Sequence, residues 1–331
     1  MQAAILQEIN QPLVIGQRET PKPKAGEVLV RLKAAALNRR DYWITQGLYP
    51  GIRSGVIQGS DGAGVVEAIG NDVEMHWVDR EVVINPGLEW GDNHQVQSEQ
   101  FHILGMPTDG TFAEAIAVPV SAIYEKPSHL DWQQAAALPL AGVTAYRAVS
   151  RAEVSAGTLV LVTGIGGGVA LMAMQLSLAL GARVLVTSSS REKLERAQEL
   201  GALGGYLYSQ DDWQKQFLRE HGMVDAVIDG AGGAGYGHLL QLAGPGARVV
   251  NYGATAGPPE KVDLFKLFWK QLKLIGSTMG TPEDFEQMLK LVSRCQVQPV
   301  VDSVYPLEEV NQALREMADS SQFGKLVLSL T

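Results

Sequence analysis

The sequence predicts an α/β protein that joins a mostly antiparallel β domain to a doubly wound parallel-sheet domain. Two kinds of sequence pattern along the 331 residues lead to this prediction. From residue 1 to about 126, short β-like runs are interrupted by Gly and Pro. After Pro127, short apolar runs alternate with helical segments, which is typical of a parallel sheet covered by helices. The length suffices for two domains.

In the first domain the β-like runs are short and are separated by Gly and Pro, a spacing that indicates an irregular, mostly antiparallel β domain. They are VLVRLKAAAL (28–37), GAGVVEAIG (62–70), REVVIN (80–85) and FAEAIAVP (112–119). We therefore assign 1–126 to this domain.

The second domain, 127–281, contains six apolar runs, each followed by a helical segment except the last. They are TLVLVTG (158–164), ARVLVTS (182–188), GGYLYS (204–209), MVDAVIDG (223–230), ARVVNYG (247–253) and KLIGSTM (273–279). This alternation is typical of an open parallel sheet with helices on both faces.

The tail 282–331 adds the amphipathic helix EDFEQMLKLV, the run VVDSVYP (300–306), a helix at 308–318 and the strand-like GKLVLSL. Because the six-stranded sheet is already complete, we expect this tail to return to the first domain.

Composition excludes several classes of function. The net charge of −9 offers no basic field to attract nucleic acid or an anionic membrane. Cys295 is the single cysteine, so neither an internal disulfide nor a multi-cysteine metal site can form. The sequence has neither a secretory signal pattern nor an apolar run of about 20 residues. We expect a cytoplasmic protein.

The first strand of the second domain leads into a glycine cluster, TGIGGGVA (163–170). Gly164, Gly167 and Ala170 are spaced for a tight turn, a close approach of pyrophosphate and close packing of the following helix. The start of a helix favours anions through its exposed N–H groups and dipole. The loop therefore predicts a dinucleotide site, with an ordinary left-handed turn as the alternative.

The end of the second strand decides which dinucleotide is favoured. An NAD site would place Asp or Glu there, but the chain has the hydroxyls of Thr187–Ser190 followed by Arg191 and Lys193. Hydroxyls and cations suit a 2′-phosphate, which favours NADP(H). Ser189 and Glu192 are also spaced as a capping box for the next helix.

The chain resembles the medium-chain dehydrogenase/reductase superfamily over essentially its whole length. Five motifs carry the resemblance in the expected order: GSDGAGVVEAIG (59–70), VDREVV (78–83), LPLAGVTAYRAV (138–149), TGIGGGVA (163–170) and SSSREKLERAQELGA (188–202). The resemblance implies a GroES-like first domain and a Rossmann second domain.

Zinc alcohol dehydrogenases of this superfamily hold a catalytic zinc through Cys, His and a third Cys or Glu. The matching positions here are Asn38, Ser60 and Leu140, whose side chains cannot replace thiolate and imidazole as zinc ligands. The structural zinc lobe lacks its four cysteines, and His94 and His102 are interpreted as loop histidines. We expect no metal.

Because the zinc ligands are missing, the chain is similar to the zinc-free quinone oxidoreductase branch. It also resembles that branch in NRRDYWITQGLYP (38–50). In that branch the equivalent of Asn38 contacts the nicotinamide and substrate, and Tyr49 and Trp43 match aromatic positions. Core packing is the alternative for both rings, and turn capping for Asn38. The resemblance implies cofactor contacts at Asn38, Thr144, Gly164, Gly167, Gly168, Val169, Ala170, Ser188, Ser189, Arg191, Lys193, Tyr208, Gly253 and Lys325.

Without a metal, oxidation of an alcohol lacks a Lewis acid, whereas an electron-poor acceptor needs less polarisation. The sequence therefore predicts hydride transfer from NADPH to a quinone or α,β-unsaturated carbonyl. Asn38 would stabilise the developing oxyanion, Thr144 would lie beside the nicotinamide, and Tyr42 or Tyr49 or water would supply the proton. Asp41 would orient this segment.

Three alternatives stay open: a related enoyl-thioester or alkenal reductase, an alcohol dehydrogenase, and a non-catalytic NADPH-binding or sensing protein. The apolar last strand, KLIGSTM, would form a sheet edge that proteins usually cover or pair across a two-fold axis. Together with the resemblance, this edge predicts a homodimer. The other expected partner is a small-molecule electrophile, a quinone or enone, as the substrate.

Overall fold

The chain divides into two compact units. A computed structural model describes residues 1–330, and the first unit joins Met1–Ala141 to Thr281–Thr331, while the second unit is Gly142–Gly280. Residues 127–141, which we assigned to the nucleotide-binding domain, thus lie with the first unit.

The first unit is built mainly from strands, with short helices between them. Its strands are β1 (Gln2–Leu6), β2 (Val14–Gln17), β3 (Glu27–Ala36), β4 (Val56–Ile57), β5 (Asp61–Ile69), β6 (Glu81–Ile84), β7 (Gly87–Leu88), β8 (His102–Ile103), β9 (Ala115–Pro119), β10 (Ile123–Glu125), β17 (Val301–Pro306) and β18 (Lys325–Ser329). Its helices are α1 (Arg39–Thr45), α2 (Trp132–Ala137), α9 (Pro282–Cys295) and α10 (Val310–Asp319). Helix α3 (Pro139–Arg151) begins in this unit.

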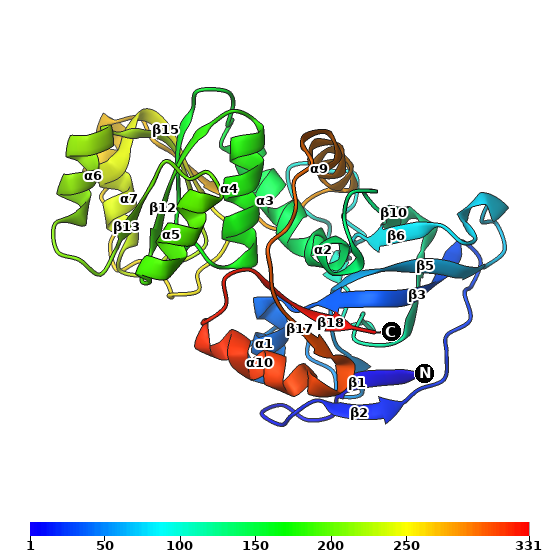
Figure 1. Ribbon diagram of the computed structural model, residues 1–331. Helices are drawn as coiled ribbons and strands as arrows, with labels where there is room; N and C mark the ends of the chain where they lie inside the picture. Colours follow the sequence, from blue (N-terminus) through cyan, green and yellow to red (C-terminus); the bar gives the residue numbers. More distant parts are fainter. Residues whose placement is uncertain (331) are drawn as a thin grey trace. The chain divides into compact units, whose positions relative to one another are not determined.

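The main sheet of the first unit has the strand order β10-β6-β5-β3-β18-β17, with β9 also paired to β3. All its pairs are antiparallel except β17 with β18. The tail therefore returns to this unit as expected: red β18 lies beside blue β3 in Figure 1. Alternate side chains of β3, β5 and β6 form one core, which includes Val30, Val66 and Val82.

The second unit alternates strands and helices as the sequence predicts. Its strands are β11 (Leu159–Val162), β12 (Arg183–Ser188), β13 (Gly204–Leu207), β14 (Val224–Asp229), β15 (Ala243–Asn251) and β16 (Lys273–Gly276). Its helices are α4 (Gly168–Ala179), α5 (Arg191–Glu199), α6 (Trp213–His221), α7 (Tyr236–Leu242) and α8 (Leu264–Trp269).

All six strands of the second unit are parallel, in the order β13-β12-β11-β14-β15-β16. The order runs one way from β11 to β13 and the other way from β14 to β16, so the topological switch point lies between β11 and β14. Helices pack against this sheet (Figure 1), and Leu161, Phe217 and Val249 belong to its core. This is the predicted doubly wound fold, whose ligands bind where the strand order reverses.

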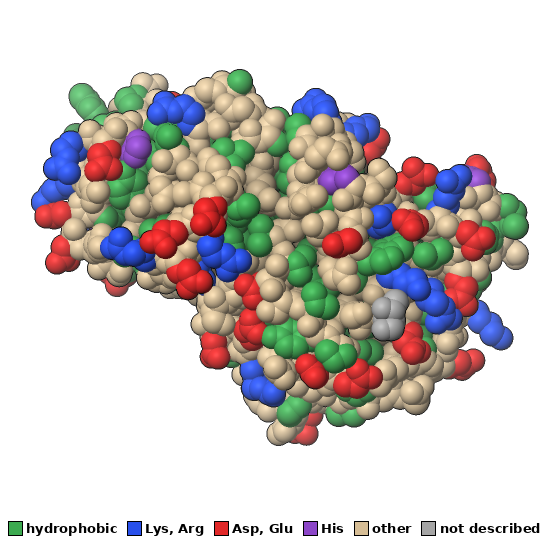
Figure 2. Space-filling model, viewed as in Figure 1, with side chains coloured by type: hydrophobic (Ala, Val, Ile, Leu, Met, Phe, Trp, Pro, Cys, Tyr) green, Lys and Arg blue, Asp and Glu red, His purple; other side chains and the backbone are tan. Residues whose placement is uncertain are grey.

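The surface carries charges of both signs. Figure 2 shows Lys and Arg side chains interspersed with Asp and Glu on the face it draws, without one broad basic field. Among residues 1–330, no helix combines the length and apolar character needed to cross a membrane.

Candidate functional site

Three polar residues, of which Asn38 is at a zinc-ligand position, lie at one end of the first unit's main sheet. Asn38 follows the end of β3, Asp61 begins β5 and Lys325 begins β18. Because β3 runs antiparallel to both neighbours, its last residues lie beside the first residues of β5 and β18. The register pairs Ala36 with Asp61 directly. Strand order thus brings together three polar side chains that are far apart in the sequence.

These three side chains form one hydrogen-bonded network. The Lys325 ammonium Nζ lies 2.6 Å from Asn38 Oδ1 and 2.8 Å from Asp61 Oδ2. Asn38 Nδ2 donates to the same Asp61 oxygen at 2.9 Å. The exposed fractions of Asn38, Asp61 and Lys325 are 7, 0 and 4 %. A lysine and an aspartate buried to this degree must be paired, and here each supplies the opposite charge to the other.

Both oxygens of Asp61 are used. Oδ1 accepts the backbone N–H of Leu140 at 2.8 Å, in the first turn of α3, where helical N–H groups lack intrahelical partners. Oδ2 accepts from Asn38 and Lys325. Leu140, the position of the third zinc ligand, therefore contributes its backbone and not its side chain.

Arg40 extends the buried network toward Ser60 and Tyr49. Its Nη1 donates to Ser60 Oγ and to the carbonyl of Leu104, each at 2.7 Å. Its Nε lies 3.3 Å from Tyr49 Oη, and its guanidinium lies over the Tyr49 ring, 4.9 Å from the centroid. The second zinc-ligand position, Ser60, is thus held by a cation. Sequence reasoning missed Arg40, because only the folded chain shows that it is buried.

Asp41 lies at the start of α1 and accepts the backbone N–H of Asn38 at 2.8 Å. Asp41 is 1 % exposed, and burial raises the pKa of its carboxyl to about 6, although Arg40, the Asn38 N–H and Lys325 oppose this shift. Its Oδ1 has no hydrogen-bond partner among residues 1–330 and lies 3.8 Å from Arg40 Nη1. Asp41 therefore fixes the backbone that carries Asn38, in the orienting place we expected.

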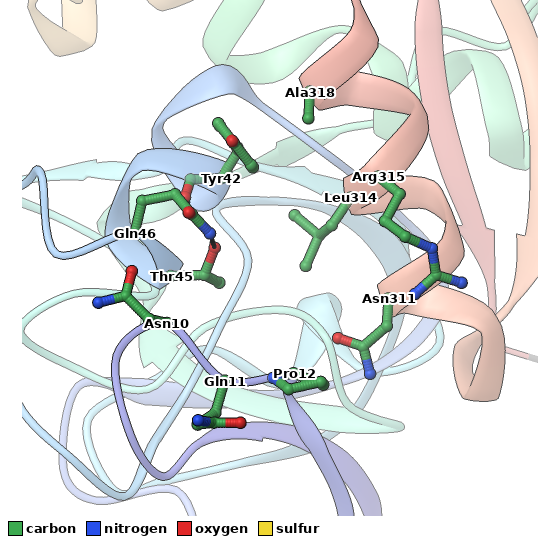
Figure 3. A pocket seen from close by; sticks show the side chains of 10 residues that line it. All are labelled: Asn10, Gln11, Pro12, Tyr42, Thr45, Gln46, Asn311, Leu314, Arg315 and Ala318. Atoms are coloured by element: carbon green, nitrogen blue, oxygen red, sulfur yellow. Dashed lines mark hydrogen bonds between the residues drawn. The ribbon is translucent and has the colours of Figure 1, made fainter.

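The two tyrosine candidates lie in different surroundings. Tyr49 contacts Arg40, whereas Tyr42 lines a hollow of about 330 Å³ in the first unit. In Figure 3 the Tyr42 side chain comes from α1, across the hollow from Leu314 and Arg315 of α10. No hydrogen bond joins the Tyr42 hydroxyl to the Asn38 network within the described part of the chain.

The glycine loop of the second unit connects β11 to α4. Gly164 and Gly166 have φ values of +64° and +122°, which side chains rarely adopt, and Gly167 is the N-cap of α4. A Cβ on Gly166 would lie 2.8 Å from Lys193 Cδ, so the Lys193 side chain crosses the loop. Gly168, Val169 and buried Ala170 form the first turn of α4. Sequence reasoning overlooked Gly166, because the spacing pattern does not include it.

The turn after β12 is organised differently from our expectation. The predicted capping box of Ser189 with Glu192 is wrong: Ser190 is the N-cap of α5, and its hydroxyl accepts from Lys193 N at 3.3 Å. The buried Ser188 hydroxyl accepts from Ser190 N. Because Ser190 provides the cap, the Ser189 hydroxyl is not used for capping. Ser189 and Arg191 are both exposed.

Three further residues were predicted to contact the cofactor: two follow strands of the second unit, and one lies in α3. Tyr208 follows β13, is 51 % exposed, and its N–H donates to the Ser188 carbonyl. Gly253 follows β15 and packs against the Gly230 backbone. Thr144 lies in α3, buried, with its hydroxyl 3.8 Å from Met279 Sδ.

A buried carboxylate that we did not predict organises the ends of β11, β14 and β15. Asp229 is 1 % exposed and accepts hydrogen bonds from Thr163 Oγ1 at 2.6 Å and Asn251 Nδ2 at 2.8 Å. It also accepts the N–H groups of the following turn, including that of Gly232 at 2.9 Å. Asp229 thus shapes the backbone at the switch point of the sheet.

His94 lies in a loop, as expected, 3.2 Å from Glu283. The loop assignment of His102 is wrong: it begins β8, and its Nδ1 lies 3.0 Å from the Gln100 carbonyl. Within residues 1–330 no three His, Cys, Asp or Glu side chains are grouped so that they could hold a metal ion.

Comparisons with known proteins agree with this architecture. The family described as Alcohol dehydrogenase GroES-like domain matches residues 24–128, and the family described as Zinc-binding dehydrogenase matches 168–294. Together these matches cover more than half of the chain. The chain belongs to the medium-chain dehydrogenase/reductase superfamily of oxidoreductases.

Individual relatives span the full length. The chain is 33 % identical to the zinc-type alcohol dehydrogenase-like protein YogA of Leptosphaeria maculans, over 98 % of this chain and 96 % of that protein. It is 28 % identical to an acryloyl-coenzyme A reductase of Sulfurisphaera tokodaii, over 99 % of each. A crystal structure of an NAD-dependent alcohol dehydrogenase superposes with a TM-score of 0.94 at 35 % identity, over 99 % of each chain.

Zinc, which one of the matched families carries in its name, does not fit the residues of this chain. Asn38 and Ser60 offer a carboxamide and a hydroxyl, and Leu140 offers an apolar side chain. Zinc sites are built from thiolate, imidazole and carboxylate. The Lys325 ammonium also lies within 2.8 Å of both Asn38 Oδ1 and Asp61 Oδ2, so a second cation there would meet a fixed positive charge.

Proposed function

We propose that this protein is an NADPH-dependent, metal-independent reductase that transfers hydride to a quinone or an α,β-unsaturated carbonyl. The observation that carries the proposal is the buried Asn38–Asp61–Lys325 network, in which Asn38 stands at the position of the first zinc ligand. This network offers the Asn38 N–H as a hydrogen-bond donor to a developing oxyanion, but it offers no Lewis acid.

The residues of the second unit fit a phosphorylated dinucleotide. Gly164, Gly166 and the start of α4 would hold its pyrophosphate through backbone N–H groups. The exposed Ser189 and Arg191, with Lys193 beside the loop, would hold the adenosine phosphate, and no carboxylate ends β12. When bound, NADPH supplies the hydride.

Asn38 has the main role toward the acceptor. Its Nδ2 has two hydrogens, and Asp61 accepts one of them. The second has no partner among the described residues 1–330, and it can donate to the oxygen on which negative charge develops. Tyr49, whose hydroxyl oxygen accepts from Arg40 Nε, keeps its own hydrogen and would supply the proton.

The same network disfavours alcohol oxidation. Removing the proton of an alcohol needs a base or a metal, but both oxygens of Asp61 already accept hydrogen bonds. Lys325 is paired with Asp61, and Arg40 lies 3.8 Å from Asp41, so the oxyanion product of hydride addition would be held by the Asn38 N–H and not by a net charge. The proposed direction is therefore reduction of an acceptor that is electrophilic by itself.

The test follows NADPH absorbance with a quinone, an enone and, in the reverse direction, an alcohol with NADP. We expect turnover of the quinone or enone that is unchanged by a chelator and by added zinc. Alcohol turnover of comparable rate, or activity that depends on stoichiometric zinc, would overturn the proposal. Tight NADPH binding without turnover of any acceptor would favour a sensing role.

An enoyl thioester is a second candidate acceptor, because one full-length relative is named an acryloyl-coenzyme A reductase. Its chemistry is the same addition of hydride to a carbon conjugated with a carbonyl. Including acryloyl- or crotonyl-coenzyme A in the panel distinguishes the two: a kcat/KM at least tenfold above that of every quinone and simple enone would assign the thioester.

A further inference from the structure

The Asn38 carboxamide lies between a group that can only donate and a group that can only accept. The Lys325 ammonium faces its oxygen at 2.6 Å, and the Asp61 carboxylate faces its nitrogen at 2.9 Å. A carboxamide can be turned by 180° with little change of shape, which exchanges the oxygen and the nitrogen. The neighbours of Asn38 therefore decide which atom it presents.

We propose that Asp61 and Lys325 are positioning residues that lock the Asn38 carboxamide in one orientation, so that it presents an N–H and not an oxygen to the acceptor. This inference rests on the proposed function, and it assigns to the pair a role exerted through Asn38.

The lock follows from charge. In the turned orientation, Asn38 Nδ2 would face the Lys325 ammonium, donor against donor, and Oδ1 would face the Asp61 carboxylate, acceptor against acceptor. All three side chains are at most 7 % exposed, so water cannot relieve these contacts. An oxygen presented to the acceptor would also repel the negative charge that forms during hydride addition.

Asp61 itself cannot follow a movement of Asn38. Its Oδ1 is held by the Leu140 N–H, and its backbone carbonyl accepts from Thr111 Oγ1 at 2.8 Å. The main chain of Lys325 is bonded to the Val300 carbonyl at 2.9 Å. Asp61 and Lys325 are therefore each held by hydrogen bonds to residues other than Asn38.

The first test is Asp61→Asn. The carboxylate accepts from three donors on its two oxygens, and an amide of the same shape must turn its NH₂ toward at least one of them. The substitution also removes the negative charge that faces Asn38 Nδ2, so the preference of Asn38 for one orientation is weakened. We expect kcat to fall on the order of 10- to 100-fold, while KM and the NADPH dissociation constant, measured by fluorescence titration, change less than twofold.

A double-variant cycle separates positioning from general destabilisation. In the Asn38→Ala background, Asp61→Asn should lower kcat no further, because the residue it positions is gone. The same fold loss in both backgrounds would overturn the proposal. Asn85→Ala is the matched control: it removes a buried hydrogen bond to Gly87 N in the same unit, and should lower thermal stability without changing kcat.

A readout that needs no turnover is the side-chain NH₂ signal of Asn38, observed by NMR of the ¹⁵N-asparagine-labelled protein and assigned through its loss in Asn38→Ala. We expect a slowly exchanging pair of resolved protons in the wild type, which Asp61→Asn shifts and exposes to faster exchange. An unchanged pair in Asp61→Asn would overturn the lock. A wild type that reduces no acceptor would overturn the proposed function, while the NMR result still decides the lock.

Discussion

The buried carboxyl of Asp41 gives the first unit a pH dependence of its own. Its pKa is raised from 3.8 to about 6 by burial, and Arg40, Lys325 and Asp61 are the charged groups that act on it. Between these two values the folded protein holds a proton that the unfolded chain has lost. Folding stability from this group is therefore complete below pH 4 and is lost as the pH rises through about 6.

Asp41→Asn removes this titration and keeps an oxygen for the Asn38 N–H. Relative to the variant, the wild type should lose roughly 2–3 kcal/mol of unfolding free energy between pH 4 and pH 7. Urea unfolding of both proteins at four pH values in this range measures the difference. Parallel stability profiles would show that the Asp41 pKa is close to its ordinary value.

The two tyrosines differ in what holds them, and this difference gives a second prediction. Tyr49 contacts Arg40 of the buried network, whereas Tyr42 lines the hollow beside α10. Tyr49→Phe should lower kcat about 10- to 100-fold by removing the proton donor, and Tyr42→Phe should change kcat by less than twofold. Steady-state kinetics with the best quinone or enone checks this; the opposite ranking would assign the proton to Tyr42.

At this scale the sequence could indicate Asn38 and Lys325 but not their partnership. A motif places a residue type at a position, whereas the contact of Lys325 with Asp61 depends on the register of β18 and β5 against β3. Arg40 and Asp229 escaped prediction for a related reason, since a charged residue in a sequence gives no sign that it will be buried and paired.

At the scale of elements, β3 and β5 approach closely enough to exclude a side chain. A Cβ on Gly64 would lie 2.1 Å from the Arg31 carbonyl oxygen, so Gly64→Ala must push the two strands apart. We expect a loss of at least about 2 kcal/mol of unfolding free energy. In Gly16→Ala of β2, the added Cβ meets only Ile5 Cδ1 at 3.3 Å, and the cost should be well below that. Urea unfolding of both variants decides; equal costs would contradict the close approach.

The turn between β12 and α5 carries the prediction on cofactor preference. Ser189→Asp places a carboxylate where the proposed 2′-phosphate binds, without removing the cap, which Ser190 provides. NADPH affinity should fall on the order of tenfold or more, about 1.4 kcal/mol, while NADH affinity holds or improves. Ser293→Asp, exposed in α9, is the control for added charge. Equal weakening of both nucleotides would place the phosphate elsewhere.

Element types in the second unit were predictable because six apolar runs and their helices repeat one pattern, and the structure confirms all six strands. Cap positions were harder to predict. Ser189 and Ser190 are chemically equivalent in the sequence, and only the backbone path after β12 decides that Ser190 accepts the Lys193 N–H.

At the scale of the whole molecule, α8 and β16 present an apolar surface. Leu264, Phe265, Phe268 and Trp269 are 66, 63, 62 and 72 % exposed, and β16 is the last strand of its sheet. We predict that the same strand of a second copy pairs with β16 across a two-fold axis and covers these rings.

Light scattering should therefore give a mass of twice the 35.6 kDa of the chain at micromolar concentration. The double substitution Phe268→Ser with Trp269→Glu should halve it. Met75→Glu changes an equally exposed apolar residue of the first unit and should leave the mass unchanged. A monomeric wild type would contradict the dimer.

The return of the tail also governs the order in which the chain can fold during synthesis. Strand β3 is complete by residue 36, yet its neighbour β18 is made only from residue 325 onward. The six parallel strands between them lie within one continuous segment and can assemble as soon as that segment leaves the ribosome. The first unit must wait for the codons of β18, and a stop codon before residue 325 would deprive it at once of a central strand and of the ammonium beside Asn38.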